Sequence, residues 1–373
     1  MSFLVRGVGA VTPVAPSAEQ TWNELLRGTG AVRQPMPKGF GGRSYYYSGV
    51  PAKFTAAVSR QPRLRRSGGI SLLGVTAGLA ALEDAGIPVE EASQGAVVFA
   101  ISCGGVDYTR RFYHEVVTEG ANVASPLLFP ETVYNAPASH LAALLKIDGR
   151  DYTLVGDSSV GLSALHFASQ LLVTDPDLPF CIVVGVEEAD WVLADAFATW
   201  RMASKQSSFA VFASMQGTIL AEGAACVVLG RTGSSIRVNT NAGLPFFTQK
   251  EAVSAFQQVV AMTSQERRPA GILCSANGTF ADRVEAAVLG SAFPAVPVYA
   301  HKPAIGDSLG ASSLLQLVLA TFALEKRELP PTLHAGDRLQ TVTREVTGIS
   351  GTELLITSVG FNQQVNAAWL SLA

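Results

Sequence analysis

Cysteine is scarce in this chain, with four residues among 373: Cys103, Cys181, Cys226 and Cys274. No two of them have the CxxC spacing of zinc sites and redox motifs, and each lies inside an apolar run. This excludes a disulfide framework and a cysteine metal site. It predicts buried free thiols in a cytoplasmic protein.

Histidine and charge are also sparse. The five histidines have no metal-ligand spacing, so we expect neither a metal nor another cofactor. Charged residues make up 15% of the chain and the formal net charge is −3, which excludes bulk nucleic-acid binding. No apolar run approaches the roughly 20 residues of a membrane helix. Residues 1–11 are too short and too interrupted by glycine for a signal peptide.

Apolar residues and glycine are abundant, at 48% of the chain and 35 residues, which indicates a large core of helices packed tightly on sheets. Strand-like and helix-like patterns alternate, as in α/β proteins. Predicted strands cover 3–11, 95–101, 152–155, 179–186, 217–229, 236–241, 271–274, 296–299, 353–358 and 365–370. Predicted helices cover 18–27, 69–85, 133–145, 159–173, 250–262, 283–291 and 308–324.

The order of these elements is roughly repeated, with a polar glycine turn at 230–235 (GRTGSS) as the seam. We therefore predict two similar halves, 1–230 and 231–373. Several strands, such as 180–186 (FCIVVGV), are apolar on both faces, which favours a sheet covered by helices on both sides.

Several motifs in order resemble the elongating β-ketoacyl-ACP synthases, a family of the thiolase superfamily. Residues 5–32 resemble the opening of these enzymes, 221–224 (AEGA) their GEGA segment, and 302–311 (KPAIGDSLGA) their lysine-containing KSxxGHxxGA motif. Residues 329–332 (LPPT) and 358–361 (SVGF) resemble the family's PPT and SFGF segments. The resemblance covers the whole chain and implies a five-layered αβαβα thiolase-like fold.

The family's catalytic residues are replaced at all three positions. The resemblance places Ser158 where the family has its nucleophilic cysteine, and a serine hydroxyl is a poor nucleophile without a general base. Asn277 and Asp307 stand at the two histidines that donate to the developing enolate during decarboxylation. Asn277 can still donate one hydrogen bond to such an enolate, whereas an ionised Asp307 would repel it. Lys302 is retained, and we expect it to support local structure.

These replacements predict that the chain does not condense acyl groups. The family contains such a subunit, the chain length factor, which pairs with an active ketosynthase. The resemblance implies the same role here: a heterodimer with a cysteine-containing synthase, an acyl carrier protein reached through that partner, and a type II polyketide, aryl-polyene or fatty-acid-like pathway. A Ser158-dependent acyltransferase or hydrolase is the alternative, and a homodimer that binds acyl chains without turnover is the third reading.

Four further expectations concern particular residues. Phe361 matches the family's gating phenylalanine beside the acyl pocket, followed by Asn362-Gln363 in place of two glycines. Glu222 is a candidate partner for Lys302. The basic run 59–68 is either a docking site for an acidic partner or a solvated loop. The strand 180–186 is expected to pair with its counterpart across a large, obligate subunit interface.

Overall fold

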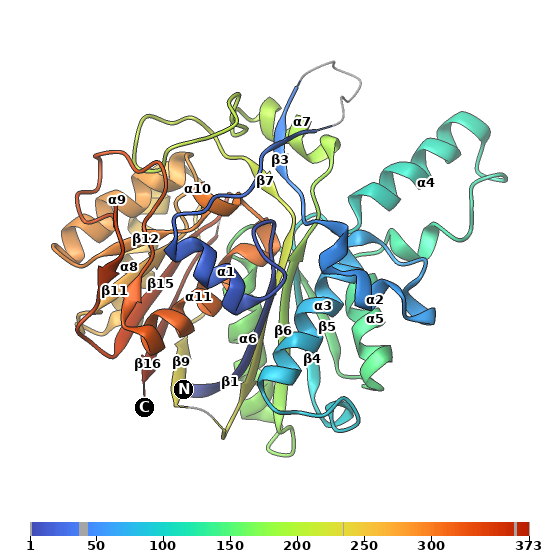
Figure 1. Cartoon of the computed structure of the whole chain (residues 1–373), viewed down its shortest axis with the longest axis horizontal. Coiled ribbons are helices and arrows are strands. Elements are labelled where there is room, and N and C mark those ends of the chain that lie inside the picture. The colour runs from blue at the N-terminus through green and yellow to red at the C-terminus, as the bar shows by residue number, and fades with distance from the viewer. Residues whose placement is uncertain (1, 37–43, 234, 362–363, 373) are drawn as a thin grey trace.

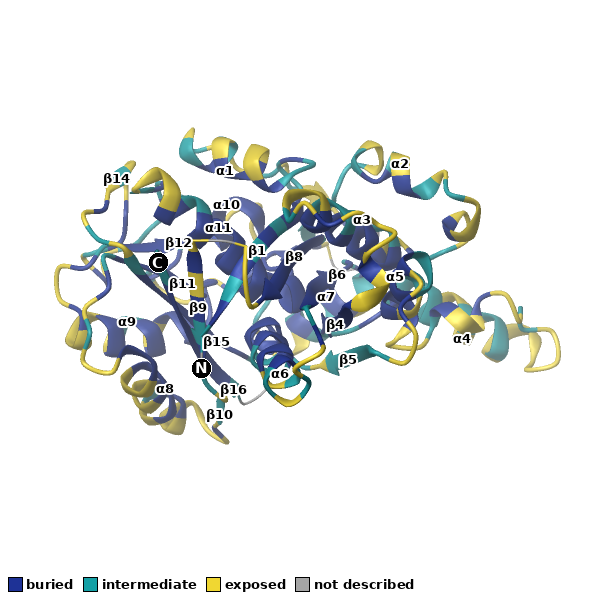
Figure 2. Ribbon diagram, turned by 90° about the horizontal axis from the view of Figure 1, so that it is seen from below, coloured by how far each residue is buried: buried dark blue, intermediate teal, exposed yellow. Residues whose placement is uncertain are grey.

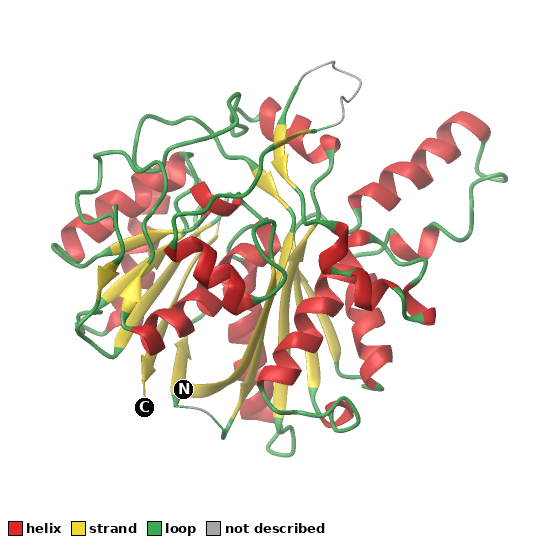
Figure 3. Ribbon diagram, in the orientation of Figure 1, coloured by secondary structure: helices red, strands yellow, loops and turns green. Residues whose placement is uncertain are grey.

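Helices and strands alternate in five layers, as the resemblance implies (Figures 1 and 3). The computed structural model describes residues 2–36, 44–233, 235–361 and 364–372. One outer layer is made by α3 (Gly69–Asp84) and α5 (Ala136–Leu145), and the other by α8 (Gln249–Ser264) and α9 (Phe280–Ala292). Between the two halves of the main sheet lie α6 (Val160–Thr174) and α11 (Ser312–Lys326).

The strands form one continuous 11-stranded sheet whose two halves have the same strand order. In the first half the order is β5-β4-β6-β8-β1, and in the second it is β12-β11-β15-β16-β9. The halves join where β1 pairs with β9, beside the polar turn at 230–235. These strands are β1 (Ser2–Val11), β4 (Ala96–Ile101), β5 (Asp151–Val155), β6 (Phe180–Glu187), β8 (Gly223–Gly230), β9 (Ile236–Thr240), β11 (Gly271–Cys274), β12 (Val298–Ala300), β15 (Glu353–Val359) and β16 (Gln364–Leu372). The division of the chain into two domains stays a prediction.

The central layer is the most apolar part of the molecule. Helix α11 and the 3₁₀ turn before it, Leu309–Ala311, form an 18-residue segment that is long and apolar enough to cross a membrane. The helix predicted over 308–324 is confirmed by this segment. Because 83% of it is buried against both sheets, it is a core helix of the fold.

The predicted elements are confirmed to within a few residues, and the differences lie in polar or short segments. Periodicity missed α4 (Val106–Glu119), which has no buried residue, and α7 (Trp191–Thr199). The strand predicted over 217–229 is interrupted at Glu222, between β7 (Leu220–Ala221) and β8. The other short elements are α1 (Ala18–Leu26), α2 (Ala56–Ser59), α10 (Lys302–Ile305), β2 (Gln34–Pro35), β3 (Tyr46–Ser48), β10 (Leu244–Pro245), β13 (Glu328–Leu329) and β14 (Thr347–Gly348).

The prediction that the strand 180–186 lies at a subunit interface is wrong. It forms β6, which is paired with β8 on one side and β4 on the other, so it has no free edge. Its apolar character on both faces comes from burial between helical layers. The free edge of this half is β5, which pairs only with β4 among the described strands.

Strand β1 packs against α3 without space for side chains. A Cβ added at Gly9 would lie 2.3 Å from the Ala77 carbonyl oxygen, and one at Gly7 would lie 2.4 Å from the Ala85 amide nitrogen. Both neighbours are backbone atoms, so they cannot move aside as side chains do. The tight packing predicted from glycine and alanine content is confirmed here.

We expect Gly9→Ala to lower the free energy of unfolding by about 1–3 kcal/mol, because it forces β1 and α3 apart. Gly348→Ala is the matched control, since nothing lies within 4 Å of its added Cβ. Urea unfolding of both variants measures the difference. Equal midpoints for the two variants would contradict this account of the packing.

Candidate functional site

Ser158 lies in the short turn between β5 and α6, at the buried start of the central helix layer. Its side chain is fully buried, and its Oγ has no hydrogen-bond partner among the described residues. The neighbouring Asp157 carboxylate instead accepts hydrogen bonds from the amide and hydroxyl of Ser159, both at 2.9 Å. The hydroxyl of Ser358 donates to the Ser158 carbonyl at 3.2 Å. No described group is placed to remove the Ser158 proton.

Asn277 is held in the loop between β11 and α9. The buried Asp282 carboxylate accepts its backbone amide at 2.7 Å, and its Oδ1 accepts the Thr279 hydroxyl at 2.6 Å. Its Nδ2 donates to Asp307 Oδ2 at 2.9 Å. The two positions that resemble the family's catalytic histidines are therefore bonded directly to each other.

Asp307 is fully buried and accepts four hydrogen bonds. Its Oδ2 accepts from Asn277 and from Lys302 Nζ at 3.1 Å, and its Oδ1 accepts from the Leu309 amide at 3.2 Å and the Ser312 hydroxyl at 2.9 Å. A carboxylate offers about four acceptor positions, so none is left for a substrate or for Ser158. We call Lys302, Asp307 and Asn277 the buried ionic cluster.

Burial alone would raise the pKa of Asp307. The adjacent Lys302 ammonium and the hydrogen bonds from Asn277 and Ser312 outweigh burial, and the net pKa lies below its ordinary value. Asp307 is therefore ionised at neutral pH, and its charge is balanced by Lys302. A negative, hydrogen-bonded carboxylate at this position does not stabilise an enolate oxygen.

Lys302 has the structural role expected of it, but not with the expected partner. It pairs with Asp307, and both side chains are fully buried. The predicted pairing with Glu222 is wrong. Glu222 lies between β7 and β8, and its carboxylate accepts the Val50 amide at 2.8 Å.

Phe361 lies beside an open cavity of about 490 Å³, next to the turn that contains Ser158. The cavity runs from the end of β5 to α7 and is largely apolar. It is lined by Ser102, Cys103, Val155, Gly156, Asp157, Leu193, Phe197, Trp200, Met202, Leu309 and Phe361. The size is within the range of about 300–1,000 Å³ common for ligand pockets. Asn362 and Gln363 lie outside the described residues.

Cys103 is in this cavity, and burial followed by the Glu187 carboxylate raises its pKa to about 12. It therefore carries no thiolate near neutral pH and does not replace the missing nucleophile.

Two adjacent buried carboxylates were missed by the sequence reasoning. Glu187 accepts the amides of Ser102, Cys103 and Gly310, so it ties together loops from both halves that form the floor of the cavity. Glu188 accepts the first-turn amides of α3 and α4. Two glutamates that end an apolar strand are the signal that could have identified them.

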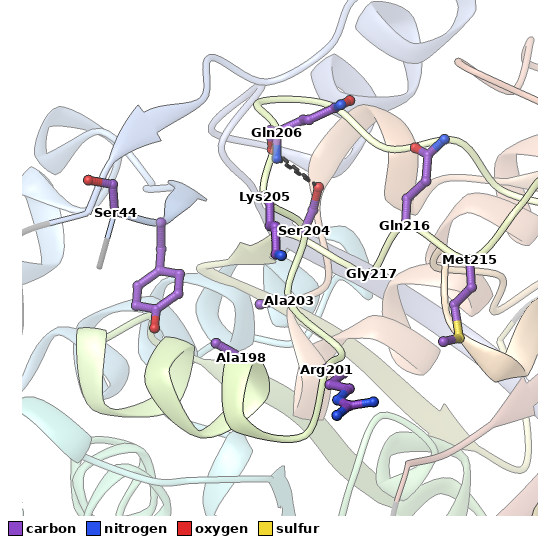
Figure 4. A pocket seen from close by; sticks show the side chains of 11 residues that line it. Ser44, Ala198, Arg201, Ala203, Ser204, Lys205, Gln206, Met215, Gln216 and Gly217 are labelled. Atoms are coloured by element: carbon purple, nitrogen blue, oxygen red, sulfur yellow. Dashed lines mark hydrogen bonds between the residues drawn. The ribbon is translucent and has the colours of Figure 1, made fainter. Parts of the chain in front are cut away.

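A second cavity shares lining residues with the first, and a third shares lining residues with the second. The second, of about 380 Å³, is lined by Trp200, Arg201, Met202, Met215, Phe246, Phe247, Thr248, Gln249, Thr279, Phe280 and Phe361. The other, about 970 Å³, is more polar, and Arg201, Lys205, Gln206 and Gln216 are at its wall (Figure 4). In it the Gln206 amide donates to the Ser204 hydroxyl at 3.2 Å.

Comparison with protein families gives two consecutive matches. Residues 3–234 match the N-terminal domain of β-ketoacyl synthases, and residues 232–336 match the C-terminal domain. The 3-oxoacyl-[acyl-carrier-protein] synthase 2 of Coxiella burnetii is 23% identical over 370 residues, which cover 89% of this chain and 87% of that protein. The enzyme of the same name from Vibrio harveyi is 24% identical over 236 residues, 61% of this chain and 57% of that protein.

Solved structures share the fold over the whole chain. A β-ketoacyl synthase from Burkholderia phymatum superposes with a TM-score of 0.86 at 18% identity, covering 100% of this chain and 99% of that one. The ishigamide ketosynthase/chain length factor gives 0.86 at 16% identity, covering 100% and 99%. A ketosynthase in complex with its chain length factor from Xenorhabdus doucetiae gives 0.82 at 18% identity, covering 100% and 98%.

We expect Lys302→Met to lower the free energy of unfolding by about 3–5 kcal/mol, because it leaves the fully buried Asp307 carboxylate without its counter-ion. Asp307→Leu in the same chain should restore part of the loss. Asp337→Asn, which breaks an exposed ion pair with Arg344, is the control and should leave the unfolding midpoint unchanged. A Lys302→Met variant as stable as the parent would show that the buried ionic cluster is not structural.

We also expect stability to fall as the pH rises from 6.5 to 8. Burial raises the pKa of Glu187 to about 8 and those of Glu188 and Glu285 to about 7, so the folded state holds protons that the unfolded chain has released. Burial lowers the pKa of His301 to about 3, which opposes this trend only below pH 6.5. Melting temperatures across this pH range measure the slope, and Glu187→Gln should flatten it. A rise in stability over the same range would contradict the sign.

Proposed function

Because this chain belongs to the β-ketoacyl synthase family, we propose that it is a non-condensing member, a chain-length-factor subunit. It pairs with an active, cysteine-containing ketosynthase and shapes the acyl tunnel of that partner. Its pathway is type II polyketide, aryl-polyene or fatty-acid-like biosynthesis. The partner supplies the nucleophile and both histidines, and the acyl carrier protein delivers substrate through the partner.

The observation that carries this proposal is the buried ionic cluster. In it the acceptor positions of Asp307 are occupied, and Asn277 Nδ2 directs one of its two N–H groups to Asp307. The third position, Ser158, has a buried hydroxyl without a described partner. A chain with this arrangement has neither a cysteine nucleophile nor a histidine donor at the positions where the family uses them for condensation.

The free edge of β5 supports a partner. The Val97 amide donates to the Arg150 carbonyl and the Gly156 amide donates to the Ile101 carbonyl, so alternate amides of the edge strand face β4. By this alternation the Thr153 amide faces away from β4, toward the open side. An unpaired strand edge is a template for pairing with a second chain.

Helix α4 is a second, independent piece of evidence for a binding partner. It projects from the body beside this edge and none of its residues is buried (Figures 1 and 2). Helix α4 and the loop after it expose large apolar side chains. Tyr113 is 61% exposed, Val117 81% and Leu127 64%. Exposed apolar surface of this kind marks protein interaction sites.

The 490 Å³ cavity lies beside the β5 edge, so its size can affect the length of the product. Val155 at the end of β5, with Gly156 and Asp157 after it, forms one wall of the cavity. A subunit paired along β5 would lie against this wall, so an acyl chain that grows in the partner can enter here. Leu193 and Phe197 of α7 line the same cavity, so their size affects how much of the acyl chain it admits.

The remaining expectations stay part of the proposal. Arg60, Arg63, Arg65 and Arg66 of the basic run are all exposed, which suits either an acidic carrier protein or solvent. Cytoplasmic location stays a prediction. The alternative of a Ser158-dependent acyltransferase or hydrolase has no base among the described residues to support it, since the acceptor positions of Asp307 are occupied.

The test is co-expression with the active synthase, followed by size-exclusion chromatography and mass spectrometry of the product. We expect a stable complex, and we expect Leu193→Phe to shorten the product because it fills the cavity. Thr153→Pro should abolish the complex without unfolding this chain, because it removes an amide that faces away from β4.

Thr153→Ala is the matched control, because it removes the side chain but keeps the amide. Ser158→Ala should leave product yield and length unchanged in the complex. A chain that never co-purifies with an active synthase would contradict the heterodimer and favour the homodimer reading. Loss of an acyl-transfer or hydrolytic activity in Ser158→Ala would support the alternative.

A further inference from the structure

The two apolar cavities are separated by side chains that belong to both. Trp200, Met202 and Phe361 line the 490 Å³ cavity at the β5 edge and also the 380 Å³ cavity that opens on the far side of α7. We call these three residues the partition. Among the described residues, these three alone line both cavities.

The partition is built from side chains that are only partly fixed. Trp200 is 62% exposed, and Met202 and Phe361 are half-buried. The buried ring of Phe197 supports two of them, with ring centroids 5.2 Å from Phe361 and 6.1 Å from Trp200. The flexible thioether of Met202 and the exposed ring of Trp200 have room to change rotamer, so the partition can be displaced.

The second cavity leads outward. Its far wall is apolar and aromatic, with Phe246 and Phe280 buried, while Phe247 and Met215 at its rim are 74% and 57% exposed. Met215 and Arg201 also line the polar 970 Å³ cavity (Figure 4). The two largely apolar cavities therefore lie one behind the other between the β5 edge and this rim, with the partition shared between them.

We propose that the acyl path through this chain is open-ended, and that the Trp200–Met202–Phe361 partition is the stop that sets product length. This inference rests on the proposed function, because the acyl chain must enter from a partner at the β5 edge. The occupant is the apolar end of a growing acyl chain, which fits the aromatic and aliphatic walls on both sides. The end of the chain meets the edges of three side chains, and a chain that displaces them continues into the second cavity.

The experiment uses the complex of this chain with its active synthase, and product lengths are measured by mass spectrometry. Trp200→Ala should shift the main product to a length greater by at least one extension unit. Its exposure means that the substitution removes little buried surface, and a melting curve checks the fold. Met202→Ala is a second variant of the same partition and should act in the same direction. Phe247→Ala is the matched control, because this ring lines only the outer cavity, and it should leave the length unchanged.

The outcomes separate the two proposals. Longer products from Trp200→Ala but not from Phe247→Ala support the stop. Unchanged length in Trp200→Ala and Met202→Ala, while Leu193→Phe still shortens the product, overturns the open-ended path and leaves the proposed function standing. Unchanged length in all of these variants overturns both. An equal increase from Phe247→Ala would also overturn the partition as the stop.

Discussion

A fully buried ion pair between Lys302 and Asp307 holds together the segments around the degenerate site. Asp307 reaches the β11–α9 loop through Asn277, and it reaches the start of α11 through Ser312. Removing two charges from water is costly, so the pair persists only because every acceptor of Asp307 is occupied. The same occupancy that stabilises the loops leaves the carboxylate unavailable to a ligand. Support of these loops and the absence of a free acceptor on Asp307 therefore have one physical origin.

Sequence reasoning performed best where burial dictates the pattern. The strands of both sheets and the helices between them are apolar enough for periodicity to place them, and motif resemblance located Ser158, Asn277 and Asp307. It could not foresee that Asn277 and Asp307 touch, because they are 30 residues apart and meet through tertiary packing. It also mispaired Lys302, since sequence gives charge but not the direction in which a buried side chain points.

The edge strand shows a more specific limit. An apolar run such as 180–186 is equally typical of a strand at an interface and of one in mid-sheet, so hydrophobicity alone chose the wrong strand. The true edge, β5, is short and half-exposed, and it carries a tyrosine and a threonine that reveal little about pairing. Helix α4 was missed because charged residues are interspersed among its apolar ones, although Tyr113 and Val117 lie four residues apart on one exposed face.

The free β5 edge and the apolar side chains exposed by α4 also affect the fate of the chain in the cell. A chain that exposes both is prone to self-association and to recognition by chaperones and proteases whenever nothing covers them. Its steady-state abundance is then tied to the supply of whatever binds that face. If the chain and its binding protein are made in equal amounts, for instance from one messenger RNA, the β5 face is uncovered only for a short time. An exposed strand edge can therefore make the amount of folded protein depend on the amount of its binding partner.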